Sequence, residues 1–133
     1  MLYLFGTGAY ENERKALKVG YTDDQKTREQ HYTLHNPLGV FKAWRDGDEL
    51  LELKLHLRLK DYKVEFLDEW FYDEPEVEEI FGLPESEIDK WLWENRTEYL
   101  LSEGVPKEGT MKARILKDLR SKFDGLILGE KTF

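Results

Sequence analysis

Short apolar runs separated by turn residues predict three strands near the start of the chain. Residues 2–5 and 16–21 are two such runs, and they predict a β-hairpin joined by the polar residues 7–15. Residues 38–44 lie between a proline and an Asp-Gly pair, which predicts a third strand followed by a turn. Residues 64–71 suit either a short strand or an ordered loop.

Two segments between these runs predict helices. Residues 25–34 follow the capping residues Thr22-Asp23-Asp24 and contain no helix breaker. In residues 48–59, leucine at every second position from 51 would also suit a strand. The remaining Glu, Lys and Arg are strong helix formers and β-branched residues are absent, so we expect a buried helix there. Glu52 and His56, four residues apart, then lie on one face of that helix.

The remainder of the chain is predicted to be helical. After the break at 73–75, the pattern predicts helices over residues 76–81, 85–101 and 111–123, the last with mostly basic residues outward. We therefore expect an α/β (α+β) fold: a small three-stranded antiparallel sheet flanked by helices in residues 1–72, with a helical C-terminal extension, residues 73–133, packed on it.

Composition narrows the class of protein. The 133 residues suit one domain with an appendage, and the absence of cysteine excludes disulfides and thiolate zinc sites. No segment approaches the length of apolar sequence that spans a bilayer, so we expect a cytoplasmic protein that does not act at a membrane.

The net charge of −8 is unevenly distributed. Residues 1–62 contain ten basic and ten acidic side chains, residues 63–106 three and fourteen, and residues 107–133 seven and four. The first segment is therefore neutral, which permits nucleic-acid binding without predicting it. The acidic segment is expected to be mostly a solvated face.

Several polar residues of the first segment form an ordered series. The series consists of Tyr3, Lys18-Val19-Gly20-Tyr21-Thr22, Arg28, the pair Glu52 and His56, and Glu69-Trp70-Phe71. A phenol, a guanidinium and a carboxylate brought together can hydrolyse a phosphodiester with one metal ion. The order and spacing resemble the GIY-YIG nuclease superfamily. They are most similar to its phage-associated branch, in which the second signature begins with Lys and a Glu-x-x-x-His helix precedes Glu-Trp-Phe.

The resemblance implies a role for each position. Tyr3 would position or deprotonate the attacking water, Arg28 would contact the phosphate, and Glu52 would bind Mg²⁺ or Mn²⁺. His56 would accept a proton or orient the water. Substrate contacts would come from Lys18, Gly20 and Tyr21. The signatures depart from the family at two points, because Met1-Leu2-Tyr3 replaces Gly-Ile-Tyr and Lys18 replaces the second signature tyrosine.

Each of these residues also has a structural interpretation. Tyr3 in an apolar run suits a core aromatic, and Arg28 on a charged helix suits a solvated charge. Glu52 in a leucine-rich helix needs a partner, which a salt bridge to Arg28 or Lys18 would supply without catalysis. Trp70 and Phe71 are expected to be packing residues.

Three functions follow from these alternatives. The leading one is a divalent-metal-dependent endonuclease or nicking enzyme acting on DNA. The second is a catalytically inactive module of the same fold that binds nucleic acid or a host protein in regulation or counter-defence. The third is an acidic decoy that mimics DNA through residues 65–103.

The extension could contribute to any of the three functions. Its basic helix offers Lys112, Lys117 and Arg120 to DNA phosphates. Its aromatic residues Trp91, Trp93 and Tyr99 could instead form a surface for a protein partner or for self-association.

Overall fold

The computed structural model divides the chain into two compact units, Met1–Leu83 and Pro84–Phe133, which are described separately. The described backbone comprises residues 1–6, 16–35, 39–65 and 69–131, and side chains are described throughout it except at 33, 35 and 124–131. The predicted loop at 7–15 lies outside the described residues. The expected domain boundary near residue 72 and the packing of the extension stay predictions.

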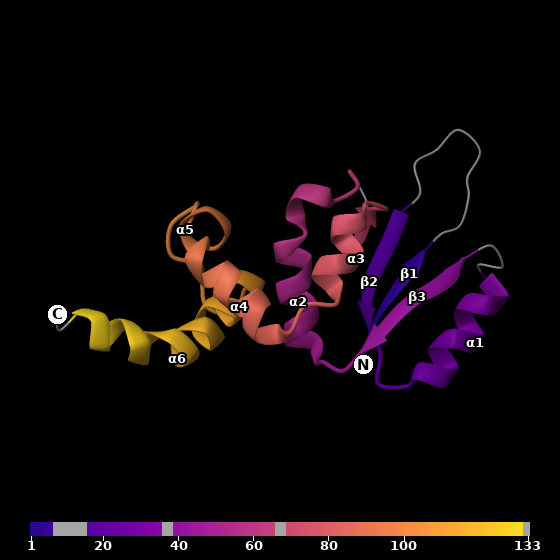
Figure 1. The fold of residues 1–133 in the computed structure, drawn as a ribbon, viewed down its shortest axis with the longest axis horizontal. Helices are drawn as coiled ribbons and strands as arrows, with labels where there is room; N and C mark the ends of the chain where they lie inside the picture. Colours follow the sequence, from indigo (N-terminus) through magenta and orange to yellow (C-terminus); the bar gives the residue numbers. More distant parts are fainter. Residues whose placement is uncertain (7–15, 36–38, 66–68, 132–133) are drawn as a thin grey trace. The chain divides into compact units, whose positions relative to one another are not determined.

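The first unit is built on a four-stranded antiparallel sheet (Figure 1). Its strands are β1 (Leu2–Gly6), β2 (Ala16–Tyr21), β3 (Val40–Arg45) and β4 (Trp70–Tyr72), in the order β3-β1-β2-β4. The expected α/β class, an antiparallel sheet flanked by helices, is confirmed. The sheet has one strand more than the three predicted. The additional strand β4 begins at the end of residues 64–71, where a short strand was one of two alternatives, and it pairs with Ala16–Lys18.

Strand β1 is buried on both faces because it is central in the sheet. On one face, Tyr3 and Phe5 pack with Tyr32 of helix α1 (Gln25–His35) and with Phe41 of β3. Successive residues of a strand point to opposite faces, so Leu2 and Leu4 point to the other face. An all-apolar β1 thus supports two cores, one on each side of the sheet.

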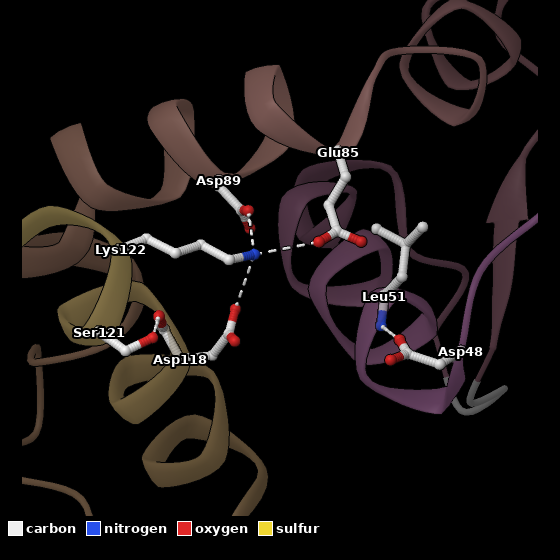
Figure 2. A network of polar contacts seen from close by, with 7 residues as sticks. All are labelled: Asp48, Leu51, Glu85, Asp89, Asp118, Ser121 and Lys122. Carbon is white, nitrogen blue, oxygen red and sulfur yellow. Dashed lines mark hydrogen bonds and ion pairs between the residues drawn. The ribbon is translucent and has the colours of Figure 1, made fainter.

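Helix α2 (Glu49–Arg58) packs against β2. It begins after Asp48, whose carboxylate accepts a hydrogen bond from the backbone N–H of Leu51 at 2.9 Å (Figure 2). The composition argument for a helix here is confirmed, and Leu51 and Leu55 are buried on its inner face. A single turn of 3₁₀ helix, η1 (Lys60–Tyr62), follows it.

Helix α3 (Pro75–Phe81) completes the first unit and lies with α2 on the side of the sheet opposite α1 in Figure 1. Arg45 of β3 donates from one guanidinium nitrogen to the carbonyl oxygens of Phe81 and Leu83, at 2.6 and 2.5 Å. These carbonyls lie at the C-terminal end of α3, where intrahelical partners are lacking, so Arg45 attaches the helix end to the sheet.

The second unit contains helices α4 (Glu85–Glu94), α5 (Arg96–Tyr99) and α6 (Met111–Lys131). The predicted single helix over 85–101 is wrong, because it is divided at Asn95. The Asn95 side-chain amide donates to the carbonyl of Trp91 at 2.8 Å, a local bond that competes with continued helix. The predicted helix starting at Met111 is confirmed and extends beyond residue 123.

The aromatic residues of this unit mainly contact other residues of the same unit. Trp93 stacks on Phe123 with ring centroids 5.6 Å apart, and the guanidinium of Arg96 lies 4.1 Å from the centroid of Trp93. Trp91 meets the buried Tyr99 edge to face at 4.7 Å. These contacts give the aromatic side chains a packing role. Among the described residues, none of the helices has the combined length and apolar composition needed to cross a bilayer.

Lys122 of α6 holds three carboxylates (Figure 2). Its ammonium lies 2.7 Å from Asp89, 3.0 Å from Glu85 and 3.1 Å from Asp118. Burial alone would lower the pKa of Lys122, but hydrogen bonds to these carboxylates outweigh it and raise the pKa well above its ordinary value. The sequence predicted mostly outward basic side chains on this helix, whereas Lys122 links α6 to α4.

We expect Lys122→Met to destabilise the second unit by about 1–2 kcal/mol. The Asp89 side chain is 3% exposed and would lose its charge-assisted hydrogen bond, whereas the partial exposure of Lys122 moderates the loss. The measurement is urea unfolding followed by circular dichroism. Lys117→Met, at an exposed lysine of the same helix, is the matched control. An equal effect of both substitutions would contradict the assignment of Lys122 as a link between the helices.

Candidate active site

A pocket of about 300 Å³ opens beside the end of strand β2. Strand β4 pairs with β2 only along Ala16–Lys18, and the described register gives Gly20 and Tyr21 no partner in β4. The pocket is lined by Tyr3, Lys18, Gly20, Tyr21, Arg28, Glu49, Glu52 and Glu69. Residues separated by up to 66 positions therefore surround one space, and six of the predicted site residues are among them.

The side chain of Tyr3 reaches this pocket by lying over Gly20, which has no side chain of its own. The two residues are cross-strand partners, and a Cβ atom at Gly20 would lie 2.3 Å from both Cζ and the hydroxyl oxygen of Tyr3. That distance is far below any van der Waals contact, so the phenol can occupy its position only opposite glycine. Tyr3 is thus both the core aromatic and the pocket residue that the sequence offered as alternatives, since it is 1% exposed and yet lines the pocket.

Tyr32 of α1 is a residue that the sequence analysis did not select. Its hydroxyl lies 3.0 Å from that of Tyr3 and accepts a hydrogen bond from the Lys18 ammonium at 2.8 Å. A phenol from helix α1 therefore stands beside Lys18 of β2. The spacing of four residues from Arg28 on one helix face was the available signal, and it is weak without the hydrogen bonds.

The two phenols differ in acidity. Burial, together with the hydrogen bond to Tyr32, raises the pKa of Tyr3 well above its ordinary value. Burial would raise the pKa of Tyr32 as well, but the hydrogen bonds from Lys18 and Tyr3 outweigh it and lower that pKa. Of the pair, Tyr32 is therefore the phenol that loses a proton more easily.

Arg28 lies on α1 beside these rings. Its guanidinium carbon is 5.8 Å from the ring centroid of Tyr3 and 5.9 Å from that of Tyr32. Both distances fall within the range of cation–π contacts, which hold the group at the pocket without using its N–H donors. The guanidinium is thus positioned to meet an anion that enters the pocket.

Glu52 is held near other acids. Among the described residues it forms no salt bridge, and Lys18, one of its two expected partners, lies 3.6 Å from Glu69 instead. Burial, followed by the nearby charges of Glu69 and Glu49, raises the pKa of Glu52 to about 7. A carboxyl with so high a pKa is typical of a functional site, because its surroundings disfavour the charged form and do not stabilise the fold.

His56 lies behind the pocket and is absent from its lining. Its Nε2 is 2.8 Å from the carbonyl oxygen of Val19, and its ring lies 5.7 Å from that of Phe71. Burial lowers the pKa of His56 despite this hydrogen bond, so the neutral ring is favoured. The structure thus brings His56 to Glu52 on one helix face, as predicted.

Glu69 joins the same group, although the sequence analysis gave it no role. One ligand atom from each of Glu52, His56 and Glu69 lies within 4.8 Å of the others. Glu69 has φ of +69°, a conformation that costs a non-glycine residue about 1–3 kcal/mol. Its carbonyl oxygen accepts a hydrogen bond from the Val19 N–H at 3.1 Å, which helps to hold it there.

The predicted DNA contacts on α6 belong to the other unit. Lys117 and Arg120 are exposed, and Lys112 is half-buried. Their role in binding stays a prediction.

The first unit thus combines an antiparallel sheet flanked by helices with a pocket lined by phenol, guanidinium and carboxylate groups. The T5orf172 domain matches residues 1–96, and the chain belongs to this family. The family is phage-associated and related to nuclease-type domains, which is consistent with nuclease-like or DNA-binding activity. Neither the curated proteins nor the solved structures contain a match to the chain.

The raised pKa of Glu52 predicts a pH-dependent stability. Because the folded pKa of about 7 exceeds the ordinary 4.5, the native state retains a proton that the unfolded state loses in this range. Stability should therefore fall as pH rises from about 4.5 through 7. Glu52→Gln removes this loss, so the variant should become more stable than the wild type above pH 7 and lose that advantage below pH 4.5.

Thermal unfolding at a series of pH values in EDTA measures this difference. Glu65→Gln, which neutralises an exposed carboxylate of the same unit, is the control and should show no such trend. A Glu52→Gln variant less stable than the wild type at pH 8 would show that the carboxylate has a stabilising partner.

Proposed function

We propose that this protein is a divalent-metal-dependent endonuclease of the GIY-YIG type that nicks DNA. The observation that supports this function best is the convergence of Tyr3, Arg28 and Glu52 in one pocket from β1, α1 and α2. Phosphodiester hydrolysis needs an oriented water, a countercharge and a metal ligand, and these three side chains supply one each.

Glu52 is the proposed ligand of Mg²⁺ or Mn²⁺. The pocket fits such an ion, because its lining contains the carboxylates of Glu49, Glu52 and Glu69. These carboxylates repel one another, and a bound cation would relieve the repulsion. When bound, the ion would neutralise charge on the phosphate and lower the pKa of a coordinated water.

The phenols provide a path for the proton of the attacking water. Tyr3 lines the pocket and hydrogen-bonds to Tyr32, which accepts from Lys18. In molecules in which Tyr32 is ionised, the proton of the attacking water would pass to the Tyr3 oxygen while the Tyr3 proton passes to Tyr32. The attacking oxygen forms a bond to phosphorus, and the bond from phosphorus to the leaving sugar oxygen breaks. The leaving oxygen would keep the electron pair of that bond and take a proton from solvent water. Lys18 stabilises the ionised form of Tyr32 before the step.

The cations at the pocket would bind the DNA backbone. Arg28 would contact the scissile phosphate, and Lys18 with Tyr21 would line its approach over Gly20. On α6, Lys117 and Arg120 are proposed to add phosphate contacts with Lys112, and their contribution should weaken with salt.

Supercoiled plasmid with Mg²⁺, Mn²⁺ or EDTA tests the proposed function. We expect metal-dependent conversion to open circles, and at least a 100-fold loss of rate in Glu52→Gln with DNA binding retained. Glu65→Gln should cleave like the wild type. Full activity of Glu52→Gln would remove Glu52 as the metal ligand. DNA binding without cleavage by the wild type would identify the inactive binding module, and neither activity would favour a protein-binding decoy.

Tyr32→Phe should reduce the nicking rate by about 100-fold without weakening DNA binding, because the ring stays in the core while the proton acceptor is lost. The rate should also lose the part of its pH dependence that reflects ionisation of Tyr32. Tyr62→Phe, at a half-buried tyrosine of η1, is the matched control. An unchanged rate and pH profile in Tyr32→Phe would exclude Tyr32 from the proton path.

A further inference from the structure

Three potential metal ligands meet at the pocket, two in its lining and His56 outside it. Glu52 and His56 lie one turn apart on α2, and Glu69 immediately precedes β4. Their ligand atoms lie within 4.8 Å of one another. Two ligands on opposite sides of a small divalent ion, with bonds of about 2.1 Å, are about 4.2 Å apart, so the three side chains are close enough for one ion to contact all of them after small adjustments.

The hydrogen bond of His56 leaves one ring nitrogen available. The Val19 carbonyl can only accept, so Nε2 carries the proton and donates to it at 2.8 Å. In the neutral ring, Nδ1 then has a lone pair and no proton. A ring nitrogen fixed by a backbone carbonyl is the usual outer contact of a metal-binding histidine, because it sets both tautomer and orientation.

The backbone of Val19 contacts two of the three ligand residues. Its carbonyl accepts from His56, and its N–H donates to the carbonyl of Glu69 at 3.1 Å. Phe71 packs against the imidazole from the adjoining β4. Since Val19 is a buried residue of β2, the rigid sheet holds the His56 ring and the backbone of Glu69 before an ion arrives.

We propose that Glu52, His56 through Nδ1, and Glu69 together form a three-ligand site that binds Mn²⁺ in preference to Mg²⁺. This inference rests on the metal site of the proposed function, and it adds two ligands and a selectivity. Imidazole suits transition metals, whereas Mg²⁺ prefers oxygen ligands and retains most of its water. A Glu-only site would discriminate little between the two ions.

Binding of the metal alone tests the inference without cleavage. Isothermal titration of the chelator-treated full chain should show one Mn²⁺ site with at least tenfold higher affinity than for Mg²⁺. His56→Gln retains a side-chain N–H for the Val19 carbonyl but removes the imidazole, and should weaken Mn²⁺ at least tenfold while changing Mg²⁺ binding less than threefold. Glu69→Gln should weaken both ions. His31→Gln, at an exposed histidine, is the control.

Pulsed EPR of the wild-type Mn²⁺ complex provides a second measurement that needs no variant. Coupling to ¹⁴N of an imidazole is expected, and its absence would overturn the inference. Equal affinity for the two ions, with no effect of His56→Gln, would also overturn it, although metal-dependent nicking could still occur. Conversely, a His56-dependent Mn²⁺ site in a protein that does not cleave DNA would support the inference and contradict the nuclease proposal.

Discussion

The pocket depends on the limited pairing of β4 with β2. The strand pairing ends at Lys18, and one further backbone hydrogen bond joins the Val19 N–H to Glu69, so Gly20 and Tyr21 extend past the edge of β4. Helix α2 packs on β2 from one face and brings Glu52 to this edge, while Lys18 and Tyr3 reach it from the other face. A longer β4 would cover the edge with backbone hydrogen bonds and separate the two sets of side chains. The position where a short strand ends therefore decides which residues meet.

The arrangement of residues at that edge lowers the stability of the folded state. Glu52 is half-buried near two other carboxylates, and Glu69 adopts a left-handed backbone conformation. Each feature costs free energy that the surrounding sheet and helices must offset. Polar groups selected for stability alone would not be placed in this way, so these costs favour a binding or catalytic origin for the arrangement.

The sequence predicted those features that depend on local pattern. Leucine and charged residues were sufficient to identify α2 and to place Glu52 and His56 on one face. Tyr32 could not be selected, because its significance depends on hydroxyl and ammonium contacts with residues 29 and 14 positions away in the chain. Glu69 likewise depends on the peptide group of Val19, which no side-chain pattern encodes. Strand β4 is a consequence of pairing, which is non-local by nature.

The acidic middle of the chain is less available to solvent than its composition suggested. Asp89 is buried, and Asp89 and Glu85 lie within 3.0 Å of the Lys122 ammonium, so part of the negative charge is compensated inside the second unit. This reduces the surface that an acidic decoy could offer. The same contacts withdraw Lys122 from any phosphate, whereas Lys117 and Arg120 stay exposed on α6. Ion pairing inside the second unit therefore argues against two of the functions considered. It leaves fewer acidic side chains for a DNA mimic, and it leaves one basic side chain fewer on α6 for DNA binding.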